Sequence, residues 1–98
     1  MAEKWKPEEM DALIRAILSL ETPEECMRFL EDLCTIKELQ SMSQRFAVAR
    51  MLSDKKVYAE VVEKTGASTA TISRVNRCLQ YGDSGYRDVI QRMKEHGV

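Results

Sequence analysis

The sequence has little of the chemistry on which most enzymes depend. It contains a single histidine, His96, two positions from the end of the 98 residues, where helices usually fray. No nucleophile, base and orienting group can be assembled around it. We therefore predict no enzyme activity and no cofactor.

Cysteine pairs and long apolar runs are also lacking. The three cysteines, Cys26, Cys34 and Cys78, form no Cys-x-x-Cys pair and lie near no histidine cluster, so we expect core positions rather than zinc ligands or disulfides. No apolar run approaches the roughly 18–20 residues of a membrane span. The first residues also lack the apolar stretch of a signal peptide. We expect a cytoplasmic protein without a membrane partner.

The whole chain has almost no net charge, but its two parts carry opposite excesses of charge. The net charge is −1, yet residues 1–40 carry 5 Lys+Arg against 10 Asp+Glu, whereas residues 41–98 carry 10 against 6. The second part is therefore basic by four charges. This excess favours a nucleic-acid partner without establishing one.

What the sequence does contain is apolar spacing typical of helices, with no sustained alternation typical of strands. A first helix is predicted to start near Pro7, a favoured first-turn residue. Thr22 and Thr35 each precede a glutamate by three residues, so capping boxes should open the second and third helices. The stripe of the first helix that we expect to be buried consists of Met10, Leu13, Ile14, Ile17 and Leu18.

Three further helices complete an all-α prediction of about six. A short helix should end near Gly66, a residue suited to a C-cap. The next is expected over 68–80, where Tyr81 and the following glycines interrupt it, and the last over 86–95. With 98 residues, the chain should form a single domain, 1–98.

Residues 61–74 have the pattern of a helix-turn-helix. Val61 should pack the first helix onto the second, Gly66 should adopt a positive φ, and Ala67 is small where the helices approach. Ser68 can cap the second helix, and Ile72 returns an apolar face to the core. The side chains left to face outward are Thr69, Ala70, Thr71, Ser73, Arg74 and Arg77.

An outward face of small hydroxyl residues with arginines is what a recognition helix presents to a major groove. We therefore predict a double-stranded DNA partner and sequence-specific transcription regulation. The competing interpretation is two core helices whose polar face is only solvated. The residues predicted to contact DNA are Lys56, Ser68, Thr69, Ala70, Thr71, Ser73, Arg74 and Arg77.

Three segments of the chain resemble the Trp repressor superfamily, in particular its short regulators from Gram-positive bacteria. They are residues 33–38 (LCTIKE), Gln44-Arg45 at the start of a long apolar helix, and residues 66–74 (GASTATISR), within a likeness that extends from Leu33 to Met93. The resemblance implies a repressor acting as an intertwined homodimer. It assigns 1–53 to dimerisation helices, 56–80 to the helix-turn-helix and 86–96 to a C-terminal dimerisation helix.

The same resemblance implies a possible site for a small-molecule effector. Thr35, Arg45 and Arg74 match positions that hold the amino-acid corepressor, and the arginines could clamp a carboxylate. Two positions depart from the family: Val75 replaces a small residue and Cys78 replaces a serine. We therefore expect an effector, if there is one, to be something other than tryptophan.

Several alternatives remain open from the sequence alone. Arg45 could instead pair with Glu38, and Arg74 could serve only as a phosphate contact. A protein-interaction module that has lost DNA binding, or a binder of RNA or of a replication origin, would carry the same motif. The sequence names neither the operator, nor the regulated genes, nor the sign of regulation.

Overall fold

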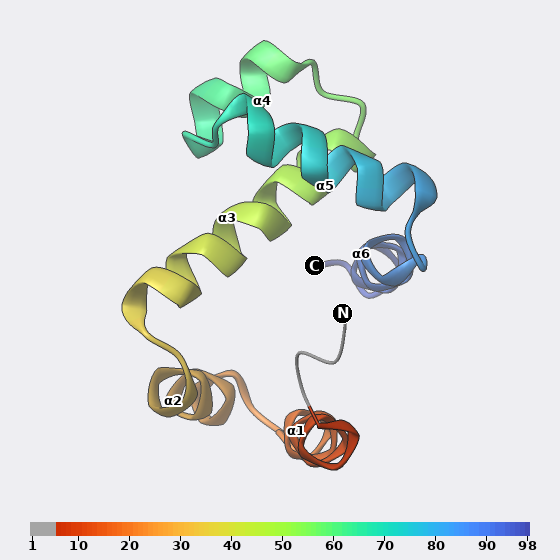
Figure 1. Ribbon diagram of the computed structural model, residues 1–98. Helices are drawn as coiled ribbons and strands as arrows, with labels where there is room; N and C mark the ends of the chain where they lie inside the picture. Colours follow the sequence, from red (N-terminus) through yellow and green to blue (C-terminus); the bar gives the residue numbers. More distant parts are fainter. Residues whose placement is uncertain (1–5) are drawn as a thin grey trace. The chain divides into compact units, whose positions relative to one another are not determined.

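The computed structural model describes residues 6–98, and within them it has six helices and no strand (Figure 1). The all-α prediction is confirmed. Residues 1–5, the start of the predicted dimerisation segment, lie outside the described part of the chain. The helices are α1 (Pro7–Leu18), α2 (Pro23–Leu33), α3 (Ile36–Ser53), α4 (Tyr58–Thr65), α5 (Thr69–Tyr81) and α6 (Gly85–Glu95).

The chain divides into two compact units, Met1–Leu39 and Gln40–Val98, so that α3 contributes to both. The first unit contains α1, α2 and the first turn of α3. The second contains the rest of α3 and the three following helices, which include the predicted helix-turn-helix. None of the helices in residues 6–98 has the length and apolar character of a membrane-spanning segment.

Side-chain caps start two helices where the sequence predicted them. At α3 the box is reciprocal: the Glu38 N–H donates to the Thr35 hydroxyl over 3.1 Å, and the Glu38 carboxylate accepts from the Thr35 N–H over 2.8 Å. At α2 the Thr22 hydroxyl accepts from the Glu25 N–H over 3.0 Å. The Glu25 carboxylate, however, accepts from the N–H of Glu21 rather than that of the cap residue.

The first unit leaves its apolar faces open. Neither α1 nor α2 contains a buried residue. On α1, Ile14 and Ile17 are 45% and 46% exposed, and Leu18 is 79% exposed. Within the first unit, the expectation that this stripe is buried is therefore not met, because neither α1 nor α2 buries any of its residues there.

The core lies in the second unit, where α3, α4, α5 and α6 each supply apolar side chains. Its largest fully buried side chain is Ile72 of α5, and burying such a side chain contributes about 1.5–3 kcal/mol. Phe46, Met51, Leu52 and Tyr86 pack around the buried set. That set consists of Val48, Ala49, Val61, Ala67, Ile72, Val75, Leu79 and Ile90.

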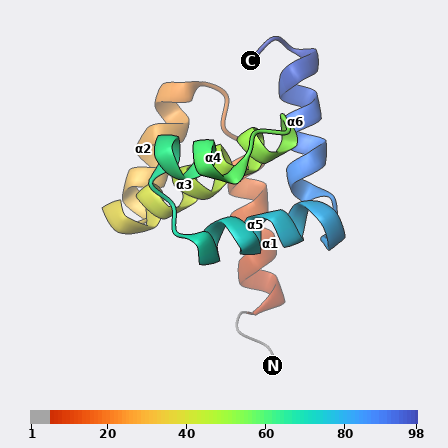
Figure 2. The ribbon, with the colours of Figure 1, turned by 90° about the horizontal axis from the view of Figure 1, so that it is seen from above.

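Helix α6 contacts α3 near both of its ends, and Figure 2 shows it leaving the end of α5 in a different direction. Near its start the ring of Tyr86 stacks on Phe46 of α3, with centroids 6.4 Å apart. Near its end Lys94 forms a 3.1 Å ion pair with Asp54, which follows α3. These contacts give the second unit a defined frame for the helix-turn-helix.

The cysteines only partly match the expectation of core positions. Cys26 and Cys34 are half-buried, but Cys78 on α5 is exposed. The prediction is wrong for Cys78, because its place on the helix lies away from the side that carries Val75 and Leu79 into the core.

Candidate nucleic-acid interface

The turn between α4 and α5 is built on a left-handed glycine. Gly66 caps α4 with φ of 70° and ψ of 8°, and its N–H donates to the Val62 carbonyl over 2.9 Å. Only glycine adopts this conformation without a steric penalty. The next residue, Ala67, is 3% exposed, so the small side chain predicted for this position lies in the core.

Two polar side chains that the motif did not point to hold this turn in place. The Thr65 hydroxyl donates to the Val61 carbonyl over 2.7 Å and accepts from the Ala67 N–H over 3.1 Å. The Gln44 side-chain amide of α3 donates to the Thr65 carbonyl over 3.0 Å. The turn is thus tied both to its own helix and to the helix beneath it.

Helix α5 begins with the predicted serine cap. The Ser68 hydroxyl accepts from the Thr71 N–H over 3.1 Å and donates to the Thr71 hydroxyl over the same distance. Both side chains are therefore engaged within the chain. This sets them apart from the other predicted contact residues of α5, whose side chains extend into solvent.

The outward side of α5 carries the remaining predicted contacts. Because Ile72, Val75 and Leu79 face the core, the opposite side of the helix is free. We call the exposed set the recognition face and α5 the recognition helix. The recognition face consists of Thr69, Ala70, Ser73, Arg74 and Arg77.

The three cations predicted to contact DNA take part in no ion pair within residues 6–98. The pairs in that range are Arg15 with Asp11 and Lys94 with Asp54. Arg74, Arg77 and the exposed Lys56, which lies in the loop before α4, belong to neither. Helix α5 also contains no acidic residue, so its guanidinium groups can meet an external anion without first breaking an internal pair.

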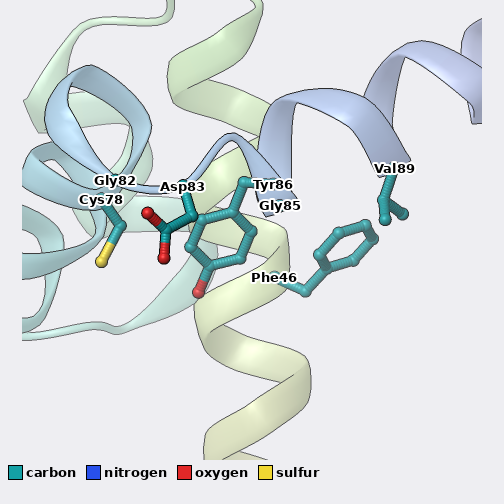
Figure 3. A pocket seen from close by; sticks show the side chains of 7 residues that line it. All are labelled: Phe46, Cys78, Gly82, Asp83, Gly85, Tyr86 and Val89. Atoms are coloured by element: carbon teal, nitrogen blue, oxygen red, sulfur yellow. The ribbon is translucent and has the colours of Figure 1, made fainter. Parts of the chain in front are cut away.

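A pocket of about 600 Å³ lies beside the other end of α5, within the second unit (Figure 3). Phe46 and Val89 form an apolar part, and Cys78, Asp83 and Tyr86 bring polar atoms. Its lining contains no lysine or arginine, so it has no clamp for a carboxylate. In residues 6–98 no His, Cys, Asp and Glu side chains gather into a group that could hold a metal ion.

This arrangement of helices, turn and exposed face agrees with what comparison with known proteins finds. A family described as Trp repressor protein matches residues 8–94. The chain belongs to the Trp repressor family. The resemblance inferred from sequence is confirmed, and the family is one of regulatory, helix-turn-helix DNA-binding proteins.

Relatives of this Trp repressor family member cover nearly its whole length. The protein named Uncharacterized protein YerC from Bacillus subtilis (strain 168) is 53% identical over 93 residues, which are 95% of this chain and 89% of the relative. A TrpR-like protein from Eubacterium eligens ATCC 27750 has a TM-score of 0.88 and 53% identity, over 91% of this chain and 92% of that one. A candidate Trp repressor from Staphylococcus aureus has a TM-score of 0.87 and 48% identity, over 91% and 89%.

The three residues expected to hold an effector lie in surroundings that differ from one residue to the next. Thr35 uses both its N–H and its hydroxyl to cap α3. Arg45 is half-buried on α3, and Arg74 is exposed on the recognition helix. None of the three lines the pocket in Figure 3, although Cys78 does. Val75 is 1% exposed, so its branched side chain fills space in the core.

Proposed function

We propose that the chain is a sequence-specific, double-stranded DNA-binding transcription repressor that acts as a homodimer. The observation that carries the proposal is the recognition face, with Arg74 and Arg77 exposed and without an acidic partner on α5. Arginine guanidinium groups form strong, charge-assisted hydrogen bonds with phosphate.

The small side chains of the face support direct contact with bases. Thr69, Ala70 and Ser73 are short, so the backbone of the helix can approach the groove closely. Threonine and serine hydroxyls can bond to base edges, and methyl groups can contact that of thymine. The longer arginines reach the flanking phosphates, which position the helix without reading sequence.

Homodimer formation is supported by the uncovered apolar surface of the first unit. Ile14, Ile17 and Leu18 on α1 and Leu33 on α2 are between 45% and 79% exposed. Large apolar side chains exposed in such number are typical of an interface, and closed two-fold dimers are the commonest assembly. Two recognition helices related by such an axis would read the two halves of a nearly palindromic operator.

Selection of bound sequences from a random duplex pool tests the proposal directly. We expect enrichment of one nearly symmetric site, with an affinity that falls steeply as salt concentration rises, because phosphate contacts release counterions. A protein-interaction module would enrich no sequence. If RNA of the same sequence displaced the bound duplex from the protein, the RNA-binding alternative would be favoured.

Two further parts of the proposal follow from DNA binding. A regulator of chromosomal genes would act in the cytoplasm of a bacterium, in line with the location expected from the sequence. Its affinity for the operator would be either constitutive or controlled by a ligand other than tryptophan, placed against Arg45 and Arg74. Residues Lys56, Ser68 and Thr71 would add contacts at the edge of the interface.

A further inference from the structure

We propose that Tyr81, at the end of the recognition helix, is an additional DNA contact that donates its phenolic hydroxyl to a backbone phosphate. The inference rests on the proposed function and extends the recognition face by one residue that the motif does not include. Three observations carry it: the position of Tyr81 on the helix, its exposure, and the way the last turn is held.

Tyr81 lies on the same line along α5 as the residues proposed to meet DNA. Ala70, Arg74, Arg77 and Tyr81 follow the spacing i, i+4, i+7 and i+11, which places side chains on one face of a helix. The buried residues of α5 lie on the opposite side. Tyr81 is 85% exposed, more than any other large hydrophobic residue in residues 6–98.

The last turn of the helix fixes the position of Tyr81 on the face of α5. The Gly82 N–H donates to the Cys78 carbonyl over 2.9 Å and closes the turn. A Cβ at Gly82 would lie 2.5 Å from that carbonyl oxygen, so only glycine allows the chain to leave the helix so tightly. Tyr81 is therefore kept in helical register with Arg77, one turn before it.

The length of the helix indicates that the hydroxyl of Tyr81 contacts a phosphate rather than a base. With a rise of about 1.5 Å per residue, Tyr81 lies about 18 Å along the axis from Thr69. The major groove is about 12 Å wide and about 8.5 Å deep, so when the first turn of the helix contacts bases, a residue this far along the axis cannot reach the floor of the groove, and the sugar-phosphate backbone at its rim is the nearer part of the duplex. A phenol can donate a hydrogen bond there without carrying a charge.

Because the phenol is uncharged, its contact with phosphate can be distinguished from that of an arginine by the salt dependence of binding. Replacing Tyr81 with phenylalanine removes only the hydroxyl. We expect about three- to tenfold weaker binding for each of the two recognition helices of the dimer, by the same factor for the selected operator and for unrelated duplexes, since phosphate contacts carry no sequence information. The dependence of log affinity on log salt should keep the wild-type slope, because no counterion is released by a neutral donor.

The experiment compares the full-length wild-type chain, Y81F and Y86F on the selected operator by fluorescence anisotropy over a salt series. Y86F is the matched control, because Tyr86 stacks on Phe46 beside the pocket rather than on the recognition face. The operator is then tested with single methylphosphonate substitutions. At one phosphate, the substitution should weaken the wild type more than it weakens Y81F.

The outcomes separate this inference from the function on which it rests. The role of Tyr81 would be overturned if Y81F bound the operator with the affinity of the wild type. It would also be overturned if Y81F altered the salt slope or changed the dimer mass in sedimentation. Each of these results would leave DNA binding intact. If the wild type itself selects no duplex, the proposed function and this contact fail together.

Discussion

At the scale of single residues, Arg77 and Thr69 share the exposed side of α5 but should contribute differently to binding. Arg77→Ala should weaken all duplexes alike, by about 1.5–3 kcal/mol for each arginine removed, and reduce the salt slope by roughly one for each, hence by roughly two for a dimer on both half-sites. Thr69→Ala should instead change the selected sequence at one position in each half-site. Anisotropy titrations and repeated selection measure the two effects.

The matched control for the first variant is Arg87→Ala, which removes an exposed arginine from α6. It should leave the affinity and the salt slope unchanged. If Arg77→Ala and Thr69→Ala both bind the wild-type operator as the wild type does, the recognition face is assigned to the wrong side of the helix.

Val75 and Cys78 carry the prediction about tryptophan. Val75 is 1% exposed and cannot turn aside without opening the core, and crowding a fitted site costs about 1–3 kcal/mol. A cysteine in place of the serine removes roughly another 0.5–1.5 kcal/mol of hydrogen bonding. Together these losses weaken the binding of tryptophan by about tenfold to a thousandfold. We expect calorimetry to detect no micromolar binding, and operator affinity to be the same with and without tryptophan.

At the scale of elements, the turn between α4 and α5 depends on the conformation of Gly66 rather than on space around it. No atom lies within 4 Å of a Cβ placed there, but φ is +70°. Gly66→Ala should therefore cost about 1–2 kcal/mol. Thermal unfolding would show a Tm lowered by roughly 4–8 °C for each kcal/mol.

Gly85→Ala provides the comparison for this variant. A Cβ at Gly85 also meets nothing within 4 Å, and its φ is not positive. That substitution should raise stability by about 0.4–1 kcal/mol, since it restricts only the unfolded chain. Equal Tm values for the two variants would show that the left-handed turn does not limit stability.

At the scale of the whole molecule, the exposed stripe of α1 predicts an assembly of two chains. Sedimentation equilibrium at micromolar concentration should give twice the chain mass of 11.3 kDa. Ile17→Asp, within the stripe, should shift the mass toward that of one chain, because a charge would have to be buried. Ala12→Asp, on the polar side of α1, should not. A wild-type mass near 11.3 kDa would contradict the dimer.

The sequence by itself determined the features that depend on neighbouring residues. The helix start at Pro7, the side-chain caps at Thr22, Thr35 and Ser68 and the left-handed turn at Gly66 follow from local hydrogen bonding and backbone sterics. The buried side of α5 also followed, because helical periodicity fixes which residues share a face.

Only the tertiary structure decided which surfaces are covered and which polar groups meet across helices. The bond from Gln44 to Thr65 and the stacking of Phe46 on Tyr86 join residues 21 and 40 positions apart. No local pattern encodes such pairs. Cys78 was expected inside and lies on the pocket, whereas the apolar stripe of α1 was expected to be buried and is open. Periodicity gives each helix an apolar side, but whether that side meets the same chain or another one depends on how the helices pack.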